Sequence, residues 1–149
     1  EYQIEGEAQT ENLTRVSGSA GYTIPYDAEK FSFETTEGID SIVSDSTAED
    51  GSYMASLTIF ENTGVTAEAF VEGLLHQAPD DAKTEEAAVG KNGTKATHIF
   101  YEKGNKYADM YVIDRGENCL MLEMWVEKEA YEGLGASLHK YIDEIEFDQ

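Results

Sequence analysis

The stretch TKATHIFYEKGNKYADMYVIDRGENCLMLEMWV, residues 94–126, decides the fold of this 149-residue chain. Three runs in it have the two-residue side-chain period that is typical of strands. The runs cover residues 94–102, 106–114 and 119–126. Short turns at Gly104 and Gly116 join them, and such turns connect antiparallel neighbours. The sequence therefore predicts an antiparallel meander, which a turn at Gly93 extends back to residues 85–89.

The last run of the meander is apolar on both faces. Leu120, Leu122, Met124 and Val126 face one way, and Cys119, Met121 and Trp125 face the other. A strand of this kind needs cover on both sides, so it should lie at the centre of the sheet with helices on each face. We expect an α+β fold, a three-layer α/β/α sandwich with a central, mainly antiparallel sheet.

The turn positions also predict which residues face each other. The turn at Gly104 places His98 opposite Tyr111, and the next turn places Cys119 opposite Asp114. His98 and Cys119 are then about three residues out of register. That separation is too large for a nucleophile and its base, which must lie within hydrogen-bond reach.

Two stretches have the period of a helix. Thr66 can cap the first helix, which Pro79 ends, and an apolar stripe follows one face between them. The second stripe covers residues 131–145, where Gly133 and Gly135 weaken the helix. Each stripe must pack against another element.

The chain divides into a polar leader and one domain. Residues 1–20 are rich in Glu, Thr, Ser, Gln and Gly, and we expect a flexible tether there, followed by a single domain over residues 21–149. Because Glu1 is not Met and no basic-then-apolar leader is present, we expect a trimmed product. No apolar run approaches the ~18 residues of a membrane helix. A membrane connection is therefore expected only through a removed N-terminal anchor.

The charge of the chain limits its partners. Ten Lys and Arg against 31 Asp and Glu give a formal net charge of -21. Nucleic acids and anionic membrane surfaces would be repelled, so we predict no nucleic-acid partner. Residues 91–126 are neutral and hold five of the ten basic residues, so the acidity surrounds a neutral sheet.

No motif in the sequence indicates catalysis. Cys119 is the lone cysteine and is expected to be a buried small hydrophobe. His76, His98 and His139 are expected to be separately solvated or capping histidines rather than a zinc site. We predict no catalytic residue, no cofactor and no metal, and therefore no enzyme.

One acidic loop leaves an alternative open. Asp45, Glu49 and Asp50 cluster within six residues, and clustered carboxylates suit calcium. The loop lacks the EF-hand glycine, because Asp50 stands at the sixth position. A solvated acidic loop is the preferred interpretation, and calcium binding stays an alternative.

Four aromatic side chains of the meander form a candidate partner-binding face: Tyr101, Tyr107, Tyr111 and Trp125. Aromatic residues are enriched at interfaces, where one end of the side chain is apolar and the other is wet. The alternative is cross-strand packing beneath a helix.

The order of elements resembles a known fold. The turn after the opening strand Tyr22-Thr23-Ile24-Pro25-Tyr26, the helix at 66–77, the spacing of Gly93 and Ala96, and a last helix running into residues 145–147 are all similar to the PsbP-like family. The family includes photosystem II PsbP, DcrB-type bacterial lipoproteins and a nuclear Ran-GTPase-binding protein. The resemblance implies a three-layer fold and carries no catalytic motif. The chain lacks the basic clusters with which plant PsbP docks.

From these features we expect a non-enzymatic binding or scaffolding domain of a bacterial cell-envelope protein. It would lie outside the cytoplasm, at the cell surface or secreted, and bind a protein or a small ligand. The alternative is a soluble intracellular adaptor that binds a basic protein partner. An enzyme is the third hypothesis, and it requires a histidine, a carboxylate and a nucleophile around one cleft.

Overall fold

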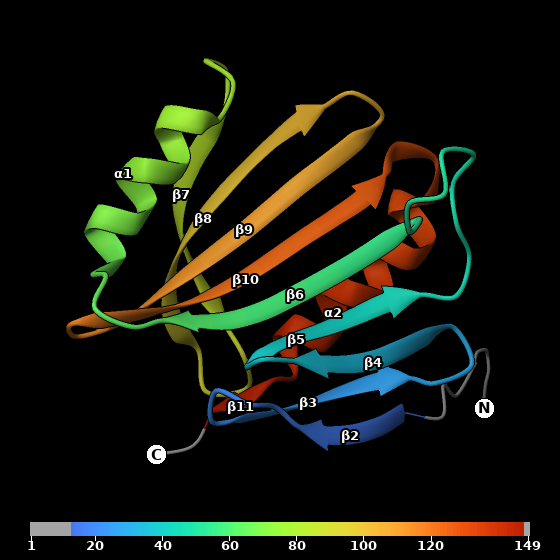
Figure 1. Cartoon of the computed structure of the whole chain (residues 1–149), viewed down its shortest axis with the longest axis horizontal. Helices are drawn as coiled ribbons and strands as arrows, with labels where there is room; N and C mark the ends of the chain where they lie inside the picture. The colour runs from blue at the N-terminus through green and yellow to red at the C-terminus, as the bar shows by residue number, and fades with distance from the viewer. Residues whose placement is uncertain (1–12, 148–149) are drawn as a thin grey trace.

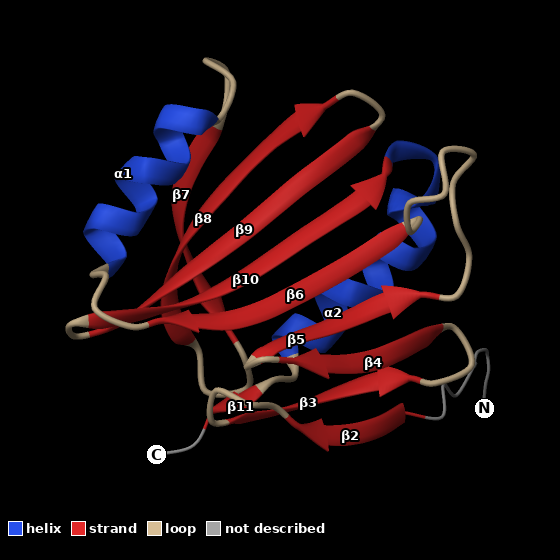
Figure 2. Ribbon diagram, viewed as in Figure 1, coloured by secondary structure: helices blue, strands red, loops and turns tan. Residues whose placement is uncertain are grey.

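The computed structural model describes residues 13–147, and this part of the chain forms two sheets and two α-helices (Figure 1; Figure 2). The large sheet has the strand order β4-β5-β6-β10-β9-β8-β7. Its strands are β4 (Phe31–Thr36), β5 (Ile39–Ser44), β6 (Ala55–Asn62), β7 (Lys83–Val89), β8 (Thr94–Lys103), β9 (Lys106–Arg115) and β10 (Asn118–Glu127). All of its neighbouring strands are antiparallel.

The predicted meander is confirmed in its order and in its register. Strands β7 to β10 follow one another as antiparallel neighbours, and β10 lies in the middle of the large sheet. His98 is paired with Tyr111, and Cys119 is paired with Asp114. Two-residue alternation and short turns fix these pairs locally, because a slip of one residue would turn every apolar side chain to the wrong face.

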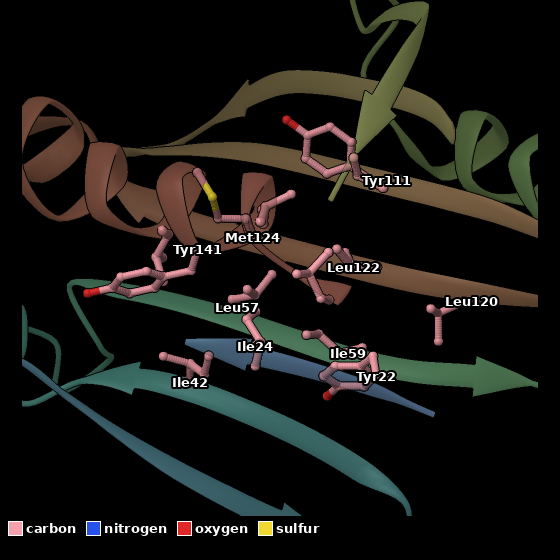
Figure 3. Close-up of a cluster of buried hydrophobic side chains, with 14 of the residues drawn as sticks. Tyr22, Ile24, Ile42, Leu57, Ile59, Tyr111, Leu120, Leu122, Met124 and Tyr141 are labelled. Carbon is pink, nitrogen blue, oxygen red and sulfur yellow. The ribbon is translucent and has the colours of Figure 1, made fainter. Parts of the chain in front are cut away.

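The larger core lies between one face of the sheet and α2 (Ala136–Asp143). Figure 3 shows Leu120, Leu122 and Met124 of β10 pointing into this core, which Tyr141 of α2 also enters. Each of these side chains is fully buried. Burying such side chains is worth about 1.5–3 kcal/mol each, and this core contains more buried apolar residues than the core on the other face.

Helix α1 (Ala67–Gln77) packs on the opposite face of the sheet. Thr66 caps it as predicted, since its hydroxyl accepts a hydrogen bond from the Ala69 amide at 3.2 Å. Phe70 and Leu74 pack on a smaller core that includes Met121. No residue of α1 is fully buried, so this helix covers its face more loosely than α2 covers the other.

A second, three-stranded sheet lies beside α2 on the larger core. It consists of β11 (Glu146–Phe147), β3 (Tyr22–Asp27) and β2 (Leu13–Ser17). The predicted tether over residues 1–20 is therefore wrong at its end, because β2 pairs with β3 over its whole length. Val16 packs on the core opposite Ile24, although the segment is too polar to signal a strand by itself. Residues 1–12 lie outside the described part of the chain.

The last helix is irregular where its glycines lie. A 3-10 turn (Lys128–Ala130) and a π-helical turn (Tyr131–Gly135) precede α2. Gly135 allows Tyr131 to lie close, since a Cβ at residue 135 would come within 3.1 Å of that ring. Tyr131 of this turn contacts Tyr107 of β9.

The α+β class with a mainly antiparallel sheet is thus confirmed. Over residues 13–147, none of the helices has the length and apolar character needed to cross a membrane.

Candidate functional site

The four aromatic residues predicted to share one face are divided between the two sides of the sheet. Tyr101 and Trp125 lie on the α1 side, with ring centroids 6.0 Å apart in an edge-to-face arrangement. Tyr111 is buried on the α2 side, and Tyr107 contacts Tyr131 on that side. The single predicted face is therefore wrong. Tyr101 and Trp125 are both paired with Ala108 of β9, and side chains at Tyr107 and Tyr111 point to the opposite side from Ala108.

A polar cluster on the α2 side brings together residues that the sequence did not group. His98 of β8 lies between two carboxylates: its Nδ1 is 3.1 Å from Oε2 of Glu85, and its Nε2 is 2.8 Å from Oδ1 of Asp109. Its ring stacks on Tyr111 with centroids 4.4 Å apart and on Phe100 with centroids 4.8 Å apart. The cluster spans three neighbouring strands, β7, β8 and β9.

The π-helical turn and α2 each bring one side chain to this cluster. Oδ2 of Asp109 is 3.5 Å from the hydroxyl of Tyr131 and 3.7 Å from Nε2 of His139. The prediction of three separate histidines is wrong in part, since His98 and His139 meet at Asp109. His76 lies at the end of α1, exposed as expected.

The carboxylates favour a charged His98. Burial opposes its protonation, but hydrogen bonds and charge from Asp109 and Glu85 raise the pKa of His98 above its usual value. Burial also opposes ionisation of Asp109, yet His139 and His98 lower the pKa of Asp109 to about 2. A neutral imidazole could donate to only one of the two carboxylates, so the geometry suits the imidazolium.

His98 is not placed to act as a general base. Both ring nitrogens of His98 face carboxylates, and neither is left to accept a proton from a substrate. Cys119 is fully buried on the other side of the sheet, where burial raises the pKa of its thiol. The predicted separation of His98 from Cys119 is confirmed, and the sheet itself lies between the two side chains.

A cavity of about 350 Å³ opens beside Asp109. Its lining consists of Asp81, Lys83, Phe100, Tyr101, Glu102, Tyr107, Ala108, Asp109 and Tyr131. It lies next to the end of β7, where β8 and β9 continue beyond their neighbour. Two predicted residues, Tyr101 and Tyr107, thus line one cavity, whereas Tyr111 and Trp125 do not.

The acidic loop has internal hydrogen bonds. Asp50 accepts hydrogen bonds from the Ser52 amide at 3.0 Å and from its hydroxyl at 2.6 Å, and Asp45 accepts one from the Ser32 hydroxyl at 3.0 Å. Between residues 13 and 147, no group of three or more His, Cys, Asp or Glu side chains is placed to hold a metal ion. The calcium alternative stays a prediction.

Comparison with known proteins supports the fold assigned from the sequence. No protein-family model and no curated protein matches the chain. The solution structure of cyanobacterial PsbP (CyanoP) from Synechocystis sp. PCC 6803 superposes with a TM-score of 0.54 at 11% identity, covering 95% of this chain and 96% of that one. The chain has a PsbP-like fold.

A crystal structure from Bacteroides thetaiotaomicron VPI-5482 has a TM-score of 0.57 at 13% identity. The alignment covers 95% of this chain and 50% of that protein, so this chain spans half the length of the Bacteroides protein. At these identities the comparisons show the PsbP-like fold alone.

The His98 cluster should make stability depend on pH. Replacing His98 with glutamine should cost about 1–2 kcal/mol near pH 5.5, because a charge-assisted hydrogen bond to buried Asp109 is lost. The raised pKa of His98 means that this contribution is complete below about pH 6.5 and is lost as the pH rises through the folded value. Below pH 3.8 it falls again as Asp109 is protonated toward its pKa of about 2.

Urea unfolding of the wild type and of His98→Gln from pH 3 to pH 9 measures this pH dependence of stability. His76→Gln is the control, since His76 is an exposed residue of α1. If the free energies of unfolding of the wild type and His98→Gln differ by the same amount from pH 5 to pH 9, His98 is not held as an imidazolium.

Proposed function

We propose that this chain is a non-enzymatic binding or scaffolding domain of a bacterial cell-envelope protein, and that it holds its ligand in the cavity beside Asp109. The observation that carries the proposal is the cavity itself, with aromatic walls formed by Tyr107 and Tyr131 around the buried carboxylate. Pockets with mostly apolar walls and a few placed polar groups are typical binding sites.

Two further points support a binding rather than a catalytic role. His98 is engaged by carboxylates at both nitrogens. The cysteine lies on the other side of the sheet.

We also propose the three-layer α/β/α arrangement, because α1 and α2 pack on opposite faces of the large sheet. This arrangement would hold the cavity walls on rigid elements.

A location outside the cytoplasm is part of this proposal, and the resemblance to bacterial lipoproteins supports it. Cell fractionation with protease treatment of intact cells tests it, using an antibody against this domain. Degradation by external protease is the expected result. Recovery in the cytosol would instead favour the alternative, an intracellular adaptor for a basic protein, which the net charge of -21 also suits.

Ligand binding in the cavity is tested by amide NMR with neutral, anionic and cationic fragments. We expect at least one class to shift the amides of residues 100–109 and 131. Tyr131→Ala, which removes a cavity wall, should abolish these shifts. The control Tyr53→Ala removes an exposed tyrosine outside the cavity and should leave them unchanged. If no class shifts these amides, the cavity is not a binding site.

A further inference from the structure

The walls of the cavity present aromatic rings from several elements. Tyr107 and Tyr131 are in contact, with ring centroids 4.7 Å apart and planes at 58°. Phe100 and Tyr101 complete the aromatic lining. The face of an aromatic ring carries negative charge density and attracts a cation within about 6 Å.

Asp109 supplies a buried carboxylate with one oxygen free for a further strong contact. Its side chain is 7% exposed. Oδ1 binds His98 at 2.8 Å, whereas the contacts of Oδ2 are long, 3.5 Å to Tyr131 and 3.7 Å to His139. A buried carboxylate oxygen is stabilised by a short, charge-assisted hydrogen bond, and these distances leave Oδ2 without one among the described residues.

The chain itself places a cation at the rim of this cavity. The ammonium group of Lys128 is 2.5 Å from Oε1 of Glu102 and lies 5.7 Å from the ring centroid of Tyr107. Both of these partners line the cavity. Lys128 thus shows that an alkylammonium fits between a carboxylate and an aromatic ring here.

The charges around the cavity favour the same sign of ligand. Asp81, Glu102 and Asp109 line it together with Lys83, and the two cations beside it are already paired, His98 with Asp109 and Lys128 with Glu102. The net charge of -21 adds a long-range field that attracts cations and repels anions.

We propose that the cavity binds an organic cation, an alkylammonium or guanidinium group, and that Lys128 competes with this ligand at the rim. The inference rests on the proposed function and names the ligand class of the same site. The cation would contact Oδ2 of Asp109 and the rings of Tyr107 and Tyr131. The group can belong to a free small amine or to a basic side chain of a partner protein.

Amide NMR titration tests the inference with N-acetyl-arginine methylamide as the probe. Its citrulline counterpart, which has nearly the same shape and no charge, is the matched ligand control. We expect the arginine compound to shift the cavity amides at concentrations where the citrulline compound does not. A short peptide with one central arginine distinguishes the sources, because a partner side chain should gain affinity from the flanking backbone and a small-amine site should not.

Two variants examine the roles of the residues. Asp109→Asn should weaken binding about tenfold or more, the effect of losing a charge-assisted contact. Lys128→Gln should tighten binding roughly two- to fivefold, the range for an exposed ion pair. Lys95→Gln is the control, because it removes the same charge from an exposed position outside this cavity. The Lys128 arm does not depend on whether Asp109→Asn folds.

Equal binding of the citrulline and arginine compounds would overturn the cation inference and leave the binding function standing. Lys128→Gln binding no tighter than Lys95→Gln would overturn the competition. Failure of every fragment class would overturn the binding function as well.

Discussion

Replacing Asp40 with alanine should destabilise the protein by about 3–5 kcal/mol, because a buried charge leaves several partners behind. Asp40 of β5 is 1% exposed. Its carboxylate accepts hydrogen bonds from the Tyr22 hydroxyl at 2.5 Å, the Ser19 amide at 2.7 Å, the Ser19 hydroxyl at 2.8 Å and the Thr35 hydroxyl at 2.9 Å. These bonds join the large sheet to the hairpin of β2 and β3.

The pKa shifts agree with this network. Burial opposes ionisation, but hydrogen bonds from Tyr22, Ser19 and Thr35 lower the pKa of Asp40. Burial and the Asp40 charge raise the pKa of Tyr22. The carboxylate is therefore ionised and the phenol protonated at neutral pH, as a short phenol to carboxylate bond requires.

Chemical unfolding monitored by circular dichroism measures the loss. Asp45→Ala is the control, since it removes an exposed carboxylate with one side-chain partner at the end of the same strand, and it should cost under about 0.5 kcal/mol. Tyr22→Phe should cost about 1–2 kcal/mol. Equal stabilities of Asp40→Ala and Asp45→Ala would show that the network does not hold the two sheets together.

Gly90→Ala should destabilise the protein by about 3–4 kcal/mol, the sum of backbone strain and a steric clash. Gly90 has φ +80°, and a Cβ there would lie 2.7 Å from the carbonyl oxygen of Ile145. The backbone cannot move away, because the Gly90 amide donates to Ile142 and the Lys91 amide donates to Ile145. This turn therefore docks the meander onto the end of α2.

Gly93→Ala provides the matched comparison within the same turn. Gly93 has φ +67°, and nothing lies within 4 Å of a Cβ placed there. Only the strain of the left-handed backbone remains, about 1–2 kcal/mol. Thermal and urea unfolding should show that Gly90→Ala is much less stable than Gly93→Ala. The reverse order would mean that the contact with Ile145 is not tight.

Only part of the candidate site could be predicted from the sequence. Alternation places His98, Asp109 and Tyr111 on one face, and the turn at Gly93 pairs Glu85 with His98, so the strand part of the cluster could have been inferred. The positions of Tyr131 and His139 over these strands could not be inferred, because the apolar stripe of a helix does not indicate which strands the helix will cover. The predicted shared aromatic face does not form, because Tyr101 and Trp125 point to the opposite side of the sheet from Tyr107 and Tyr111.

The sequence by itself determined the meander, its register, the central place of β10 and the cap of α1. Each depends on residues within one strand, one turn or one helical turn, where steric limits and side-chain periodicity act over short distances. Only the tertiary structure decided that β2 extends the second sheet, that Asp40 joins the two sheets, and that Asp109 lies beneath Tyr131 at a cavity. These contacts join segments far apart in the chain, and they depend on how whole layers pack rather than on any local pattern.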